Sequence, residues 1–141
     1  MSVALKTIQR VRDFLLADSR LVAKISDRFW AIRSPQSERS AYVVWQNISG
    51  SDIFAHDGPT QNEEFRLQFS IFAPTAQETY EIRDIIKDRI NGISGVLVDV
   101  RIGFCFFDND IDGIADEAGL IQKTIDFRVS AAPIQSSKQQ Q

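Results

Sequence analysis

The clearest chemical pattern in the sequence is a short acidic run, Asp-Asn-Asp-Ile-Asp-Gly, which begins at residue 108. It matches the first half of a calcium-binding loop, in which oxygen ligands recur at alternate positions and a glycine, here Gly113, allows a sharp turn. A backbone carbonyl and one more carboxylate would follow in such a loop. The candidate calcium ligands are therefore Asp108, Asp110, Asp112, Ile114 and Asp116.

The second half of the same segment departs from the calcium pattern. Its twelfth position is Gly119, where a calcium loop has a bidentate glutamate, and Glu117 is the nearby substitute. The flanking residues also alternate as strands do, whereas calcium loops of this type lie between helices. The alternative is an acidic, solvated hairpin loop in which Asp and Gly act as turn formers and no cofactor is bound.

Few residues have the types or spacing that catalysis requires. His56, the sole histidine, follows an apolar stretch and precedes Asp57, with no nucleophile at a recognisable spacing. Cys105 lies between Phe104 and Phe106, which predicts a buried, unreactive thiol and fits a reducing compartment. We therefore expect a protein that is not an enzyme and has no catalytic residues.

Composition and charge predict one globular domain. The chain has 141 residues, 43% of them hydrophobic, and a net charge of −3 with scattered Lys and Arg, so it has no basic strip for gripping nucleic acid. No apolar run approaches the length of a membrane span. We expect a single α+β domain over residues 1–132, and a disordered polar tail over 133–141.

The segment 62–92 is the best-determined unit of the predicted fold. Apolar residues alternate with polar ones from Phe65 to Ile71, which predicts a half-buried strand. Ala73-Pro74 ends it, and Thr75-x-x-Glu78 is a capping box for an amphipathic helix that stops at Asn91-Gly92.

The remaining segments predict further helices and strands around this unit. Apolar spacing predicts a helix over 3–16 and a short second helix capped by Asp18 and ending near Ser26. A short strand is expected over 29–32, and longer strands over 41–49, 96–107 and 120–129. Lys123 falls on the apolar row of the last strand, so we expect that end at a sheet edge. The predicted architecture is a mostly antiparallel sheet of four to five strands with two main helices on one face.

Residues 50–61 connect two predicted strands and are too long for a tight hairpin turn. Such a loop would protrude and expose Ile53 and Phe54 near its tip. It either contacts a partner or folds back on its own sheet. The interface candidates are Ile53, Phe54, His56, Asp57, Asp108, Asp110, Asp112 and Lys123.

Several short motifs together resemble the small tail-completion, or tail-terminator, proteins of long-tailed bacteriophages. Such proteins begin with a helix, an Arg-aromatic segment and a Tyr-Val-Val strand, and close with a strand like the last one here. The likeness covers about residues 1–131, although Ala41 stands where the family usually has Pro. The motifs are Asp27-Arg28-Phe29-Trp30, Ala41-Tyr42-Val43-Val44-Trp45, the strand and capped helix from Phe65 to Thr75, and Thr124-Ile125-Asp126-Phe127-Arg128-Val129.

The resemblance implies a head–tail joining role in a virion. Subunits of similar proteins form a ring, a hexamer, which caps the finished tail tube and presents it to the head connector. The implied partners are other copies of the chain, the tail-tube protein and the head-connector protein, with DNA passing through the ring lumen without being gripped. Assembly would take place in the cytoplasm of the host bacterium, with no membrane involved. The segments 50–61 and 108–119 would then carry contacts between subunits or with the tube, and another minor tail component is the alternative.

Overall fold

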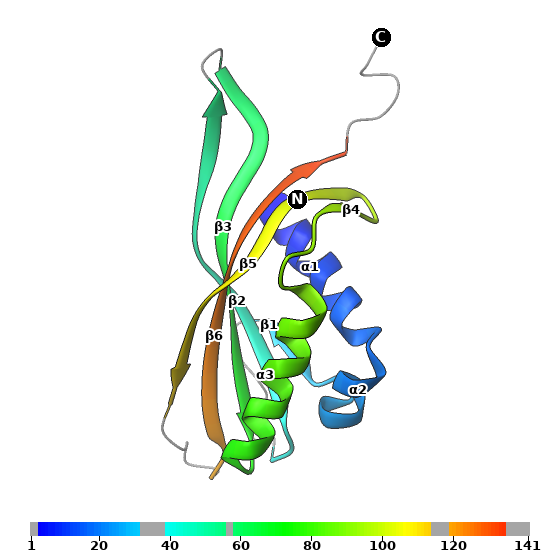
Figure 1. Cartoon of the computed structure of the whole chain (residues 1–141), viewed down its shortest axis with the longest axis vertical. Helices are drawn as coiled ribbons and strands as arrows, with labels where there is room; N and C mark the ends of the chain where they lie inside the picture. The colour runs from blue at the N-terminus through cyan, green and yellow to red at the C-terminus, as the bar shows by residue number, and fades with distance from the viewer. Residues whose placement is uncertain (1–2, 32–38, 56–57, 114–118, 135–141) are drawn as a thin grey trace.

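A computed structural model describes residues 3–31, 39–55, 58–113 and 119–134. In these ranges the chain forms three helices and six strands (Figure 1). In chain order they are α1 (Val3–Leu16), α2 (Ser19–Ile25), β1 (Phe29–Ala31), β2 (Tyr42–Ala55), β3 (Gly58–Ala73), α3 (Ala76–Ile90), β4 (Gly95–Leu97), β5 (Val100–Asp112) and β6 (Ile121–Pro133).

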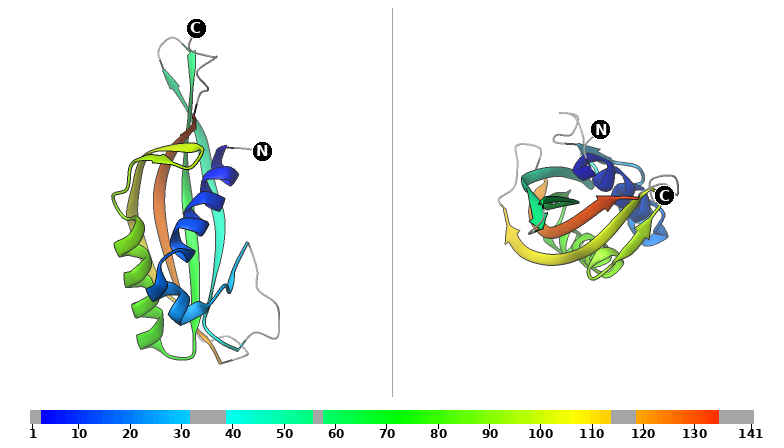
Figure 2. Two further views of the ribbon diagram at one scale, coloured as in Figure 1. Left: turned by 90° about the vertical axis from the view of Figure 1, so that its right-hand side faces the viewer. Right: turned by 90° about the horizontal axis from the view of Figure 1, so that it is seen from above.

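The six strands form one curled sheet in the order β1-β2-β3-β6-β5-β4. Every neighbouring pair is antiparallel except β1 and β2, which run parallel. The helices lie together on one face of the sheet, with α1 and α3 both in contact with β3 and β6 (Figure 2). The α+β class and the one-sided helices are confirmed. The expected four to five strands were too few, and the sheet is mixed.

The unit formed by β3 and α3 follows its sequence pattern closely. The alternating apolar residues of β3 are buried against the helices, and the hydroxyl oxygen of Thr75 accepts a hydrogen bond of 3.2 Å from the backbone N–H of Glu78. At the other end, Gly92 adopts a φ of +88°, a left-handed conformation that glycine reaches at no steric cost. The predicted start and stop of the helix are confirmed.

The short helix α2 begins at the predicted cap. Both oxygens of the Asp18 carboxylate bind Arg20, one of them also accepting from the Arg20 backbone N–H at 2.9 Å. The guanidinium of Arg20, followed by its backbone N–H, lowers the pKa of Asp18 from 3.8 to about 2, although burial acts in the opposite direction. The first turn of α2 is therefore stabilised by a carboxylate that stays ionised down to low pH.

This cap predicts a specific acid sensitivity. Because the pKa of Asp18 is lower in the folded chain, its stabilisation is present above about pH 4 and is lost as the pH falls toward about 2. Asp18→Asn keeps an oxygen that caps the helix but does not titrate. Thermal melts between these pH values should show the midpoint of the wild type falling more steeply than that of Asp18→Asn. Parallel curves would contradict the assignment.

Four phenylalanine rings form the centre of the core between sheet and helices. Phe69 packs edge-on against Phe29 and Phe127, and Phe127 packs edge-on against Phe107, with centroids 5.6–5.9 Å apart. Such T-shaped contacts align the positive edge of one ring with the negative face of the next. A smaller cluster of Tyr42, Val44 and Leu120, with Trp30 and Phe72 against it, packs separately from this core.

The predicted strand over 96–107 is wrong in one respect, because a turn divides it. Leu97 pairs with Val100, so Val98 and Asp99 form a tight turn, and Val98 has a φ of +58°. The apolar alternation continues through the turn, and Asp99 is the only one of its two central residues that is of a common turn type. Asp99 fixes this turn against α1 by accepting two hydrogen bonds from Arg10, of 2.7 and 3.0 Å.

The predicted loop over 50–61 is instead the outer part of a long hairpin. Strands β2 and β3 stay paired as far as Ala55 and Gly58. Its neighbours end earlier: β1 pairs with β2 only as far as Trp45, and β6 pairs with β3 only from Glu63. Beyond these points the two strands form a ribbon that projects past the body of the molecule (Figure 1). We call residues 53–55 and 58–62 the hairpin arm.

Within the described residues, none of the helices is both long and apolar enough to cross a membrane.

Candidate functional site

Two of the predicted calcium ligands lie in an ion-pair cluster between the sheet and α3. The ammonium of Lys123 lies 2.5 Å from Asp110 and 2.6 Å from Asp112. A guanidinium nitrogen of Arg83 lies 2.5 Å from the other oxygen of Asp110. The hydroxyl of Tyr80 donates to Asp112 at 3.0 Å, and its ring centroid is 3.9 Å from the ammonium. We call these five residues the lysine cluster.

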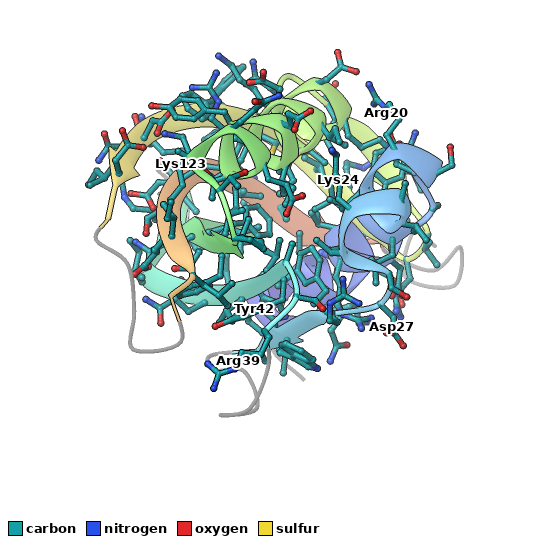
Figure 3. The ribbon with its side chains drawn as sticks, turned by 90° about the horizontal axis from the view of Figure 1, so that it is seen from below. Arg20, Lys24, Asp27, Arg39, Tyr42 and Lys123 are labelled. Atoms are coloured by element: carbon teal, nitrogen blue, oxygen red, sulfur yellow. The ribbon has the colours of Figure 1, made fainter. Side chains whose placement is uncertain are left out.

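The position of Lys123 corrects the prediction of a sheet edge. Its strand, β6, lies inside the sheet between β3 and β5, and the side chain is only 2% exposed (Figure 3). Its register neighbours are Ile71 and Asp112. The charge is tolerated on the apolar row because the end of β5 brings two carboxylates to it.

Electrostatics keep the lysine cluster ionised. Burial alone lowers the pKa of Lys123, but the hydrogen bonds with Asp110 and Asp112 outweigh it, so the pKa is raised. For Asp110, burial alone raises the pKa, but the hydrogen bonds from Lys123 and Arg83 outweigh it, so the pKa is lowered. Hydrogen bonds from Lys123 and Tyr80 lower the pKa of Asp112. The cluster therefore joins β5, β6 and α3 through fixed opposite charges.

Asp108 does not join its two acidic neighbours. The pairing of β5 with β6 shifts register between Phe107 and Asn109, and the Asp108 carboxylate accepts a hydrogen bond from Arg66 instead. Within the described ranges, no group of three or more acidic, His or Cys side chains is placed to hold a metal ion. Ile114 and Asp116 lie outside those ranges, and calcium binding stays a prediction.

Arg66 and Asp108 belong to a row of polar side chains that crosses the sheet. Gln46 donates to Gln68 at 2.7 Å, and Gln68 donates to Asp126 at 3.2 Å. Asp126 is also 3.7 Å from Arg66. The row therefore joins β2, β3, β6 and β5 through polar contacts that the sequence alone did not indicate, because it depends on strand register.

Of the remaining predicted interface residues, the structure describes the backbone of two, and both lie at the hairpin arm. Ile53 and Phe54 belong to β2, in the ribbon that only the two strands themselves form. His56 and Asp57 lie outside the described residues. The structure therefore brings Asp110, Asp112 and Lys123 together, and it places Ile53 and Phe54 on a separate projection.

Cys105 is buried, as predicted. Burial raises the pKa of its thiol to about 12, so the thiolate needed for nucleophilic chemistry is scarce at neutral pH.

An open groove that the sequence did not reveal lies between α1 and the edge strand β1. Its volume is about 380 Å³, and it reaches Trp45 of β2. The side chain of Arg12 lines this groove, and its Nε donates a hydrogen bond of 3.2 Å to the Phe29 carbonyl. We call it the edge groove. Its walls include Gln9, Arg12, Asp13, Phe29, Ala31 and Trp45.

The comparisons with known proteins define the fold of the chain. No family model matches the sequence, and no curated protein matches it. Among solved structures, the chain is similar to one from a structure described as the virion of a native gene transfer agent particle. The likeness covers 86% of this chain and 91% of that chain, with a TM-score of 0.72 and 17% sequence identity. The two chains share a fold over nearly their whole lengths.

Proposed function

We propose that this protein is a structural subunit of a phage-like virion, specifically a ring-forming tail-completion or head–tail joining protein. The observation that carries the proposal is the fold shared with a chain of a gene transfer agent virion over 86% of this chain. The sequence motifs that resemble tail-completion proteins support the same role independently. A shared fold alone leaves function open, so the proposal also rests on what the surface of the molecule offers.

Two features of the structure favour a structural role. The hairpin arm projects from the body and is suited to contact another chain (Figure 1). The charged groups of the lysine cluster bind one another, which stabilises the fold and leaves them poorly placed to act on a substrate. The protein would assemble with itself as a hexameric ring, and with tail-tube and head-connector proteins, while DNA passes through the lumen. Its location would be the virion neck, after assembly in the host cytoplasm.

Sedimentation velocity over a wide range of protein concentration tests the ring directly. We expect a discrete large species that grows with concentration, and electron micrographs of it should show closed rings. Repeating the runs with calcium and with a chelator also tests the calcium hypothesis. A chain that stays monomeric at every concentration would oppose self-assembly, and a monomer that compacts only with calcium would favour a calcium-binding module.

Shortening the arm should separate folding from assembly. Deleting residues 53–57 shortens the hairpin arm, whose described residues pair only with each other, so the body should keep its thermal unfolding midpoint. The same deletion should abolish the large species in sedimentation. As a control, Phe106→Ala removes an apolar side chain that is 54% exposed at a distance along the sheet, and it should assemble normally. Normal assembly of the deletion variant would exclude the arm from the mechanism.

A further inference from the structure

We infer that the turn formed by Val98 and Asp99 between β4 and β5 docks on the C-terminal end of β5 in a second copy of this chain. The inference rests on the proposed self-assembly and names two surfaces that meet in it. The first is an apolar turn accompanied by cations, and the second is an acidic strand end with an exposed isoleucine. The side chains of both surfaces belong to the described residues.

Val98 has a backbone conformation and an exposure that its own fold does not explain. Its φ of +58° lies in the left-handed region, where a β-branched side chain is strained and glycine is not. The residue is 74% exposed, so it gains little from burial in its own chain. Backbone strain of this kind is concentrated at functional sites. The turn therefore serves a contact outside its own chain.

The turn is held firmly and is accompanied by cations. Asp99 accepts two hydrogen bonds from Arg10, of 2.7 and 3.0 Å, and lies 3.7 Å from the ammonium of Lys6. Arg101 is the register partner of Val96 on β4, and both residues are exposed. Three cations thus accompany one carboxylate at this turn. A surface that is fixed before binding loses little conformational entropy when a partner arrives.

The C-terminal end of β5 has the complementary properties. Ile111 is 54% exposed and stands between Asp110 and Asp112 in the strand. Among the described residues, the ion pairs at this end join five carboxylates to three cations, so the end carries an excess of negative charge. The carboxylates are those of Asp84, Asp108, Asp110, Asp112 and Asp126, and the cations are Arg66, Arg83 and Lys123.

The two surfaces match in both apolar character and charge. In the contact, Val98 packs against Ile111 of the second copy, and both lose exposed apolar surface, which is favourable. Arg101 then approaches the carboxylate of Asp112, which is 63% exposed. Opposite charges also orient the two chains before they bind.

The two surfaces lie at opposite ends of one strand, so they cannot meet within a single chain. β5 runs from Val100 to Asp112, a length of about 40 Å at the usual rise of a strand. Figure 1 shows β4 in the upper part of the molecule and the end of β5 in the lower part. The contact is therefore heterologous, and repeating it from copy to copy produces a closed ring when the rotation closes.

Cross-linking between two single-site variants tests the contact. Val96→Cys places a thiol beside the turn and Ile111→Cys places one at the end of β5, while Cys105 is buried with a pKa raised to about 12. The two variants are mixed at high concentration, treated with a short bis-maleimide and analysed for mixed dimers. Sedimentation velocity is run on the same mixture. The control pairs Val96→Cys with Val22→Cys, whose site on α2 is 42% exposed.

We expect a large species and a yield of mixed dimer several-fold above that of the control pair. A large species with no more cross-link than the control would overturn the inference and leave the ring intact. Monomers with no cross-link above the control would overturn both the inference and the proposed self-assembly.

Val98→Gly separates the contact from folding. Glycine adopts the left-handed φ without strain, so the thermal unfolding midpoint should stay the same or rise. Loss of the side chain should nevertheless raise the protein concentration needed for the large species by about tenfold. Val22→Ala truncates another exposed valine and should leave assembly unchanged. Assembly of Val98→Gly at the wild-type concentration would overturn the inference.

Discussion

Replacing Phe127 with alanine should lower the free energy of unfolding by about 3–5 kcal/mol, because the ring is wholly buried at the centre of the aromatic core. The ring meets Phe69 and Phe107 in edge-to-face contacts, with centroids 5.9 and 5.6 Å away, so the substitution leaves a cavity lined by rigid rings. The loss is comparable to the whole stability of many small domains. Urea denaturation followed by circular dichroism measures it.

Two companion variants identify the cause of that loss. Phe127→Leu retains most of the buried volume and should cost about 1–2 kcal/mol. Phe106→Ala removes a ring that is half-exposed and should change the stability by less than about 1 kcal/mol. Equal losses for Phe127→Ala and Phe106→Ala would show that burial in this core is not what stabilises the sheet.

Replacing Lys123 with alanine should cost about 2–3 kcal/mol, the second largest effect we expect from a single substitution. The change removes a buried stem and leaves the carboxylate of Asp110, 22% exposed, with Arg83 as its remaining partner in the cluster. Asp112 is 63% exposed, so water can solvate its carboxylate once the ammonium is gone. The loss of stability is therefore smaller than for a fully buried ion pair. Chemical denaturation at neutral pH measures the change.

Lys123→Met separates packing from charge at the same position. Methionine fills nearly the same space as lysine but lacks the ammonium. The difference in unfolding free energy between Lys123→Ala and Lys123→Met therefore measures the cost of the cavity, and the difference between Lys123→Met and the wild type measures the loss of the ion pairs. We expect methionine to recover about half of the stability lost in the alanine variant. Two variants with equal stability would mean that the stem of Lys123 contributes nothing by packing.

The elements that the sequence predicted well depend on neighbours in the chain. The capped start of α3 at Thr75, the cap of α2 at Asp18 and the alternation along β3 all depend on residues a few positions apart. Propensity and period describe such contacts directly. These caps and this strand are therefore found in the structure as the sequence predicts.

The predictions that failed depended on pairing between distant segments. Lys123 was unusual on its own strand, and only the register with Asp112 on β5 explains why it is buried. The edge groove exists because α1 lies beside β1, which no local pattern reveals. The sequence predicts a loop over 50–61 because this connection is too long for a tight hairpin turn, yet β2 and β3 stay paired as far as Ala55 and Gly58.

The position of β6 has a consequence for how the chain reaches its folded state. β6 is the last strand in the sequence, but it lies between β3 and β5 and pairs with both along most of its length. During synthesis the inner edges of β3 and β5 therefore stay without their partner until β6 leaves the ribosome. Pairings over such sequence separations form slowly, and open edges in the meantime invite association between nascent chains. Folding of this sheet is thus completed by its final strand, which makes chains that stop before β6 prone to aggregation.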